Sequence, residues 1–515
     1  MLFNSFIFIF IFLPVTVAVF FWLGRKSHAW AAGWLALASL FFYGYWDYRY
    51  IPLLLASIGF NYLVGLRIAQ TAMPARKRWL VVGVGSNLLL LAYFKYANFF
   101  LETISFVSNN NLPSLDIILP IGISFYTFTQ IAFLVDTYQG KVKEYRFVHY
   151  LLFVTYFPHL IAGPVLHHKE MMPQFSDERI YKYSSENFAV GLTIFCIGLA
   201  KKVLIADNLA PFAAPLFENP ASPSLLLAWG GVLAYAFQLY FDFSAYSDMA
   251  IGLSRLFGVR LPLNFNSPYK AENISEFWRR WHMTLSRFLR DYLYFPLGGN
   301  RTGMFNRYRN LMVVMLLGGL WHGAGWNFII WGGLHGLYLV IHHAWVGVSK
   351  SLRFPSDSAI WKLAATVMTF IAVCFAWVFF RSPDLGTSWE IVRGMTGGFG
   401  VALPEAIGSR LGALGTMLEN AGVNYYLGGG ARFIENWSWV MFAAAIAFLL
   451  PNTQQIVRRF EPALDFLPAA QPGPGRAATW LTWLPSRRWA MFLGVLAVAS
   501  LLSLNRPNEF LYFQF

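Results

Sequence analysis

The residue best placed for chemistry in this sequence is His322, which lies inside a long apolar stretch. The stretch Leu311–Ser349 contains no Asp, Glu, Lys or Arg, so its expected surroundings are hydrocarbon or protein interior. An ionisable side chain at such a depth costs free energy and is by default a candidate for function. A neutral imidazole can take the proton from a hydroxyl group as that group attacks an acyl carbon. The sequence therefore predicts His322 to be a general base.

The flanks of this stretch predict how the chain carries His322. Arg260–Asn310 is strongly basic, and Lys350, Arg353 and Lys362 follow the stretch, so both ends are expected in the cytoplasm. The stretch must then enter the membrane and return, as a hairpin or a re-entrant pair of half-helices. At 1.5 Å per residue, His322 lies roughly 17 Å along the ingoing half, near the middle of a core about 30 Å thick. Seven glycines, which allow close approach of backbone, surround it: Gly318, Gly319, Gly323, Gly325, Gly332, Gly333 and Gly336.

The composition predicts a polytopic membrane protein. Of 515 residues, 57% are hydrophobic and only 12% charged, against about 25% charged in soluble proteins. The net charge of +14 fits cytoplasmic loops and anionic lipid headgroups, and it does not indicate nucleic acid. The two cysteines, Cys196 and Cys374, lie in apolar runs and form neither a disulfide framework nor a metal cluster. Motifs for a P-loop, a zinc protease or a nucleophile elbow are absent from the sequence.

The charges of the loops predict which side of the membrane each one faces. The basic loops Arg25–Lys26 and Arg67–Arg78 are expected in the cytoplasm, and Leu101–Asp116, which has no Lys or Arg, is expected outside. Three apolar runs follow at 148–166, 187–207 and 224–258, where the charge rule requires an even number of crossings. Either one run is re-entrant or the third crosses twice, and Lys201–Lys202 makes the second run the better re-entrant candidate. Later apolar runs follow at 363–380, 437–451 and 489–504. The segment 381–436, between the first two of them, is a possible small external subdomain.

The basic segment 260–310 is predicted to contain an amphipathic helix over Ile274–Tyr292 at the membrane interface. Its apolar residues recur at three-to-four spacing, Asn273 is a good N-cap, and Glu276 stands at the capping-box position. His282 shares the apolar face and should point into the protein or membrane. Arg279 and Arg280 lie toward the other face.

Other polar residues in apolar runs have two interpretations each. Asp242 and Asp248, in FDFSAYSDMAIG, either form ion pairs with Arg255 or the basic loop, or help to orient a histidine. His335 and His159 either line the same cavity as His322 or only pack. His342 and His343, near the cytoplasmic end of the stretch, are expected to be structural.

Two motifs in this sequence resemble those of the membrane-bound O-acyltransferase family. The first is SEFWRRWHMTLSRFLRDYLYFPLGGN (Ser275–Asn300), which contains His282, and the second is GGLWHGAGWNFIIWGGLHG (Gly318–Gly336), which contains His322. Further runs, including the ending FLYFQF, resemble the bacterial branch that acetylates exopolysaccharides such as alginate. The resemblance covers nearly the whole chain.

This resemblance implies an all-α polytopic fold, a single domain over residues 1–515. A ring of about eleven spanning helices, with re-entrant and interfacial helices, would surround a central funnel or tunnel. The charge pattern disagrees, because it places both termini outside, which requires an even number of crossings.

The resemblance also implies a function. His322 would match the essential histidine of the family and His282 its second motif histidine. The acyl donor would be acetyl-CoA, and Arg279, Arg280, Trp278 and Asn327 are the candidates to bind it, with no metal ion. The acetyl group would cross the bacterial inner membrane to periplasmic partner proteins that O-acetylate an exopolysaccharide.

Two alternatives stay open on the sequence. A related branch of the family transfers D-alanyl groups from a small carrier protein to a cell-surface polymer. A transporter without chemistry would also have polar residues in its spans and a glycine-broken hairpin. The transporter gives no reason for two histidine motifs in close succession.

Overall fold

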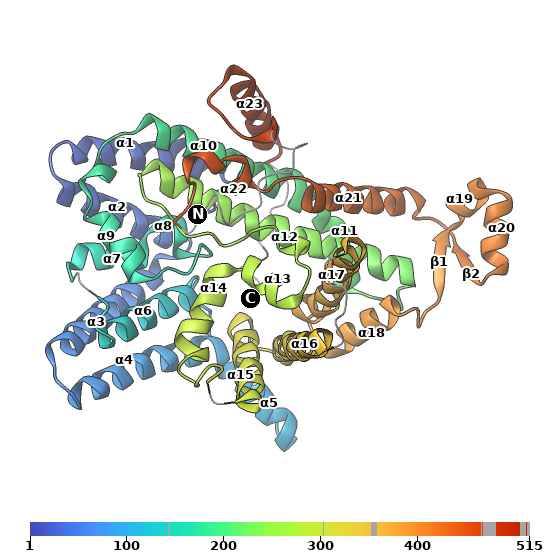
Figure 1. Cartoon of the computed structure of the whole chain (residues 1–515), viewed down its shortest axis with the longest axis horizontal. Coiled ribbons are helices and arrows are strands. Elements are labelled where there is room, and N and C mark those ends of the chain that lie inside the picture. Colours follow the sequence, from blue (N-terminus) through green and yellow to red (C-terminus); the bar gives the residue numbers. More distant parts are fainter. Residues whose placement is uncertain are drawn as a thin grey trace.

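The computed structural model describes residues 1–142, 145–301, 303–351, 358–464, 466, 480–504 and 511. Within these residues the fold is helical apart from one two-stranded parallel sheet (Figure 1). Five of the described helices are long and apolar enough to cross a membrane: Tyr48–Gln70, Ala75–Ser108, Ser185–Glu218, Leu225–Leu256 and Ala359–Arg381. Phe8–Gly24 is a shorter apolar helix. The chain is therefore a multi-pass membrane protein, and the ring of about eleven helices stays a prediction.

The N-terminal part of the chain, up to residue 138, contains six α-helices, and the last of them is largely buried. It consists of α1 (Leu13–Gly24), α2 (His28–Gly44), α3 (Ile51–Gln70), α4 (Ala75–Leu91), α5 (Ala97–Ser108) and α6 (Ile123–Tyr138), with π-helical turns at Phe8–Phe12 and Ala92–Tyr96. Helix α6 packs against α3 and α4, and its polar residues Thr127, Thr129 and Gln130 are buried. The polar side chains of α6 therefore lie among other helices rather than against lipid.

The structure corrects the predicted re-entrant run. The second run, expected to be re-entrant, belongs to a continuous helix made of α10 (Ser185–Ala200), a π-helical turn (Lys201–Ala206) and α11 (Asp207–Glu218). The first run is the broken one, because it holds only α7 (Phe147–Thr155) and α8 (Phe157–Leu160), followed by α9 (His168–Phe175). Lys201 and Lys202 misled the prediction because they suggested an interruption, whereas both are paired inside the protein.

Those pairs join the π-helical turn to α12 (Leu225–Leu256), the long helix that runs through the middle of the molecule (Figure 1). Lys202 Nζ lies 2.7 Å from Asp242 Oδ1 and 2.7 Å from Asp207 Oδ1. Lys201 Nζ lies 2.8 Å from Asp248 Oδ2. Asp242 and Asp248 are thus in ion pairs, as one interpretation held, but the predicted partner Arg255 was wrong.

The predicted amphipathic helix over 274–292 is not continuous. The structure has α13 (Ile274–Arg280), then a break, then α14 (Met283–Leu289) and a π-helical turn (Arg290–Tyr294). The break lies at Trp281 and His282, because Trp281 is extended and His282, with a φ of 41°, is left-handed, and neither conformation fits an α-helix. The N-cap prediction is confirmed, because Asn273 Oδ1 accepts a hydrogen bond of 2.9 Å from the Glu276 backbone N–H.

The predicted hairpin is confirmed by α15 (Met304–His322) and α16 (Trp326–Ser351), which pack against each other. Glycines make this contact possible. A Cβ atom on Gly319 would lie 2.1 Å from the Phe328 carbonyl oxygen, and one on Gly332 would lie 2.2 Å from the Met315 carbonyl oxygen. His322 is the last residue of α15, directly before the turn.

The remaining elements form the C-terminal part. They are α17 (Ala359–Arg381), α18 (Leu385–Met395), β1 (Val401–Pro404), α19 (Glu405–Gly408), α20 (Ala413–Asn420), β2 (Val423–Tyr426), α21 (Gly430–Leu449), α22 (Thr453–Ile456) and α23 (Arg487–Leu502). The strands with α19 and α20 extend from one end of the molecule (Figure 1), and Val401 pairs with Val423. That this subdomain is external stays a prediction. Arg353 and, apart from Leu511, the ending FLYFQF lie outside the described residues.

Replacing Gly332 with Ala should destabilise the protein, because the new methyl group would meet backbone rather than a movable side chain. Overpacking of this kind typically costs about 1–3 kcal/mol. Thermal unfolding in detergent would measure the loss as a lower melting temperature. Gly333→Ala is the matched control, since its Cβ would lie 3.6 Å from Leu316 Cδ2, an ordinary contact. Equal melting temperatures for the two variants would contradict the close packing.

Candidate active site

His322 lies in an aromatic cage and lines a cavity. Three aromatic rings meet the imidazole of His322 edge-on, with distances of 4.9–5.3 Å between ring centroids. They belong to Trp321, Trp331 and Phe380. It is 7% exposed and borders a cavity of about 240 Å³. The cage fixes the plane of the imidazole, while the cavity gives a small molecule or a side chain access to it.

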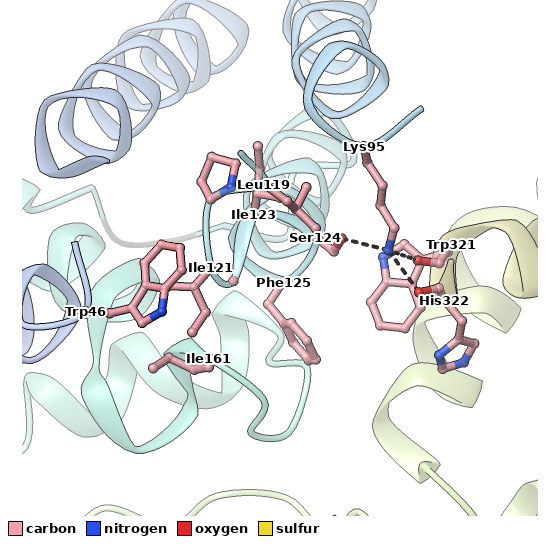
Figure 2. Close-up of a pocket in the computed structure, with 12 residues that line it drawn as sticks. Trp46, Lys95, Leu119, Ile121, Ile123, Ser124, Phe125, Ile161, Trp321 and His322 are labelled. Atoms are coloured by element: carbon pink, nitrogen blue, oxygen red, sulfur yellow. Dashed lines mark hydrogen bonds between the residues drawn. The ribbon is translucent and has the colours of Figure 1, made fainter. Parts of the chain in front are cut away.

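Segments far apart in the sequence form the walls of this cavity (Figure 2). Trp46 follows α2, residues 119–125 lead into α6, and Ile161 follows α8. Lys95, from the π-helical turn Ala92–Tyr96, completes the wall beside His322. Lys95 was not among the residues predicted from the sequence, although a single lysine within the apolar run 79–99 is a signal for a functional residue.

A hydrogen-bond network holds His282 in one orientation. His282 Nδ1 lies 2.9 Å from Asn264 Oδ1, and Asn264 Nδ2 donates to Ser247 Oγ at 3.2 Å. Because the amide nitrogen of Asn264 faces Ser247, its oxygen faces His282 and accepts the Nδ1 proton. Thr284 Oγ1 donates to the same oxygen at 2.9 Å. A neutral His282 therefore carries its proton on Nδ1 and leaves Nε2 unprotonated.

The two motif histidines, which are forty residues apart in the sequence, lie close together in the structure. The ring centroids of His282 and His322 are 6.4 Å apart, and His282 is fully buried with no hydrogen-bond partner for Nε2 in the described part of the chain. Ser247, from the FDFSAYSDMAIG run, orients a histidine through Asn264, whereas Asp242 and Asp248 are in ion pairs. Asn264, a polar residue in the apolar run LPLNF, was not among the residues predicted from the sequence.

His335 is fully buried and packs against Trp331, which also contacts His322. Its ring centroid lies 4.9 Å from that of Trp331 and 5.1 Å from that of Trp278, and neither ring nitrogen has a partner among the described residues. His335 does not border the cavity at His322. It contacts that site through Trp331, which both histidines touch.

The four predicted donor-binding residues lie in different environments. Arg279 is exposed, and Arg280 forms an ion pair with Glu276 within α13. Trp278 is buried beside His335. Asn327 instead ties the hairpin to α17, because its Nδ2 donates to the Ser382 carbonyl oxygen at 2.7 Å.

A second cavity, of about 780 Å³, lies at the other end of α16. It borders the N-terminus of α13 at Asn273, the half of α16 that contains His342, and α17 near Lys362. His342 is fifteen residues from Asn327, which corresponds to about 22 Å along a helix. The two cavities therefore lie toward opposite ends of the hairpin.

His159 packs inside the protein and does not border the cavity at His322. His159 Nε2 lies 2.9 Å from the Phe153 carbonyl oxygen, and the residue is 3% exposed and absent from the cavity wall. Within the described residues, His, Cys, Asp and Glu side chains form no group of three or more suited to a metal ion.

Comparisons with known proteins connect this geometry to a chemistry. Residues 88–381 match the family described as MBOAT, membrane-bound O-acyltransferase. The chain is 48% identical over 431 residues to a peptidoglycan O-acetyltransferase of Helicobacter pylori, covering 78% of this chain and 81% of that protein. It is 39% identical to a probable alginate O-acetylase, AlgI, of Pseudomonas aeruginosa over the full length of both. A teichoic acid D-alanyltransferase of Streptococcus thermophilus is 28% identical over 45% of this chain and 59% of that protein.

Replacing Asn264 with Leu should destabilise the protein and release His282. The change leaves a buried Nδ1–H and a buried Thr284 hydroxyl without their acceptor, and each such loss costs about 1–3 kcal/mol. Thermal unfolding in detergent would measure it. Asn424→Leu, at an exposed position on β2, is the control and should stay within about 0.5 kcal/mol of the parent. If both variants melt like the parent, the network does not hold His282.

Proposed function

Since the chain belongs to the membrane-bound O-acyltransferase family and is an acyltransferase, we propose that it carries acetyl groups across the bacterial inner membrane. The donor is acetyl-CoA in the cytoplasm, and periplasmic partner proteins pass the group on to a cell-surface polysaccharide. His322 is the centre of the reaction.

One observation carries this proposal: His322 lies at the turn of the α15–α16 hairpin and borders a cavity, and the charge rule assigns two of the other wall segments to the external side. Trp46 follows α2, which starts after the basic Arg25–Lys26 loop, so Trp46 is on the external side by the charge rule. Residues 119–125 follow Leu101–Asp116, which the same rule places outside. An acceptor hydroxyl from the periplasmic side therefore has a route to the imidazole.

The opposite end of the hairpin supports a cytoplasmic donor. The larger cavity lies beside the N-terminus of α13, in the basic segment 260–310, and near Lys362. A basic face attracts the phosphates of CoA and raises its local concentration. Arg279, which is exposed, is better placed than Arg280 to meet a phosphate, because Glu276 already pairs with Arg280. The indole of Trp278, on α13, contacts that of Trp331, which in turn contacts His322.

The reaction follows from these positions. The acceptor oxygen attacks the thioester carbonyl carbon, and His322 removes the hydroxyl proton as the new C–O bond forms. The C–S bond then breaks, and the CoA thiolate takes the proton from His322 and leaves on the cytoplasmic side. His282, fixed by Asn264, orients the thioester or His322. A transiently acetylated His322 is the alternative route, in which the same C–S bond breaks first.

The relatives support acetyl as the group and polysaccharide as the acceptor class. Two named acetylating enzymes match most or all of the chain, and one of them acts on peptidoglycan. The D-alanyltransferase relatives support the runner-up, transfer of D-alanine from a carrier protein, but they match a smaller share of the chain at lower identity. Consumption of acetyl-CoA by membranes, with no requirement for a carrier protein, distinguishes the two.

Replacing His322 with Gln should abolish acetyl transfer, since His322 is the one histidine on the described wall of the acceptor cavity. Loss of a general base lowers the rate about 100- to 10,000-fold. The measurements are acetyl-CoA consumption by membranes from cells that express the full chain and acetyl ester on the cell-surface polysaccharide, at matched protein levels. His28→Gln is the control, because His28 stacks on Tyr181 away from the site. Normal acetylation by the His322 variant would remove this residue from the mechanism.

Replacing Arg279 with Ala should raise the KM for acetyl-CoA several-fold and leave kcat nearly unchanged. The side chain would contribute to binding of the donor phosphates equally before and during the reaction, and such a loss affects KM alone. Initial rates against acetyl-CoA concentration provide the test. Arg49→Ala, which removes an exposed arginine paired with Asp47, should change neither constant. An unchanged KM in the Arg279 variant would place the donor elsewhere.

A further inference from the structure

Lys95 is a charged residue in a membrane-spanning helix that has no carboxylate partner within the described residues. It lies in the apolar helix Ala75–Ser108, twenty residues from its cytoplasmic start. Lys201 and Lys202, which lie in the middle of another candidate span, each pair with an aspartate. A lone charge in a span is costly and is retained where it has a function.

The partners of Lys95 are backbone carbonyl groups at the end of α15. Its ammonium group donates to the carbonyl oxygens of Trp321 and His322, the latter at 3.1 Å, and lies 3.4 Å from Ser124 Oγ (Figure 2). It also lies 5.9 Å from the ring centroid of Trp321. The charge therefore rests on the negative end of the helix that carries His322.

Together with Tyr96, Lys95 completes the end of that helix. The last four carbonyl groups of an α-helix have no partner within the helix. Here the Gly319 carbonyl accepts from the Gly323 N–H, and the Leu320 carbonyl accepts from the Tyr96 hydroxyl at 2.8 Å. The remaining two carbonyl groups, those of Trp321 and His322, accept hydrogen bonds from the Lys95 ammonium group. Every carbonyl at the end of α15 is thus satisfied, three of them by two adjacent side chains.

The π-helical turn Ala92–Tyr96 explains how adjacent side chains reach one helix end. A π-turn is wider than an α-turn and is common at functional sites. It changes the direction of successive side chains, so that Lys95 and Tyr96 both meet the end of α15. A local distortion in one helix thereby sets the position of the last residue of another.

We propose that Lys95 is a positioning residue for acyl transfer: its ammonium group binds the C-terminal carbonyls of α15 and fixes the backbone of His322 at the acceptor cavity. This role rests on the proposed function of His322. Lys95 is the single cation on the described wall of that cavity. It holds the imidazole in reach of the acceptor without exchanging protons with either substrate.

Lys95→Met should remove the clamp while keeping the length of the side chain. We expect kcat for acetyl-CoA consumption to fall about 100-fold, the effect typical of a misplacement near 1 Å, and KM for acetyl-CoA to stay within about twofold. Tyr96→Phe is the matched control, because it removes one neutral hydrogen bond from the same helix end and keeps the charge. Its kcat should fall less than about tenfold. Equal kcat values for Lys95→Met and the parent would overturn the proposal.

Chemical rescue separates the charge from general packing. Lys95→Cys should be as inactive as Lys95→Met, and 2-bromoethylamine would convert the new cysteine to a lysine analogue with the same chain length and charge. Restored kcat in this variant, with no gain in Lys95→Met treated alike, supports the clamp. If mass spectrometry finds the cysteine modified but kcat stays low, the ammonium group is not what positions His322.

A measurement without catalysis keeps this inference separate from the proposed function. Ala324 is exposed in the turn after His322, so the rate at which a maleimide labels Ala324→Cys reports the order of that turn. Adding Lys95→Met should change the labelling rate several-fold, and adding Tyr96→Phe should change it less. If parent membranes consumed no acetyl-CoA, the proposed function would fail. The labelling rates would still show whether Lys95 orders the end of α15. Identical labelling in all three backgrounds would overturn it.

Discussion

Polar groups inside a membrane must find their partners within the protein, since hydrocarbon offers none. In this chain, Lys201 and Lys202 pair with aspartates of α12, Lys95 binds the end of α15, and His282 is held by Asn264. Each contact joins segments far apart in the sequence. The same constraint therefore also fixes the orientation of His282, because its partner Asn264 is fully buried and water cannot replace it.

The hairpin of α15 and α16 places His322 at its turn, on the wall of a cavity. Gly319 and Gly332 allow the two helices to approach so closely that backbone meets backbone, which leaves His322 at a turn of fixed geometry. One cavity borders His322, and a larger one lies toward the other end of α16. Such an arrangement suits the proposed reaction, whose two substrates arrive from opposite faces.

The sequence predicted the parts of this structure that depend on local pattern. A charge-free apolar stretch with basic flanks predicted the hairpin and His322, and spacing predicted the start of α13 at Asn273. It could not predict contacts that arise only when distant segments meet. The pairing of Asp242 and Asp248 with Lys201 and Lys202 was missed for that reason, as were Asn264 and Lys95. The left-handed backbone at His282 was missed because periodicity continues across the break.

The central claim is that the acetyl group crosses the membrane while CoA does not. It can be tested with inside-out membrane vesicles from cells that express the full chain with its acceptor polymer. Acetyl-CoA labelled with different isotopes in the acetyl and CoA parts is added to the exposed cytoplasmic face. The predicted result is acetyl label on polymer inside the vesicles, with all CoA label in the outer medium. Entry of both labels together, or acetyl ester formed only outside, would contradict transfer through the protein.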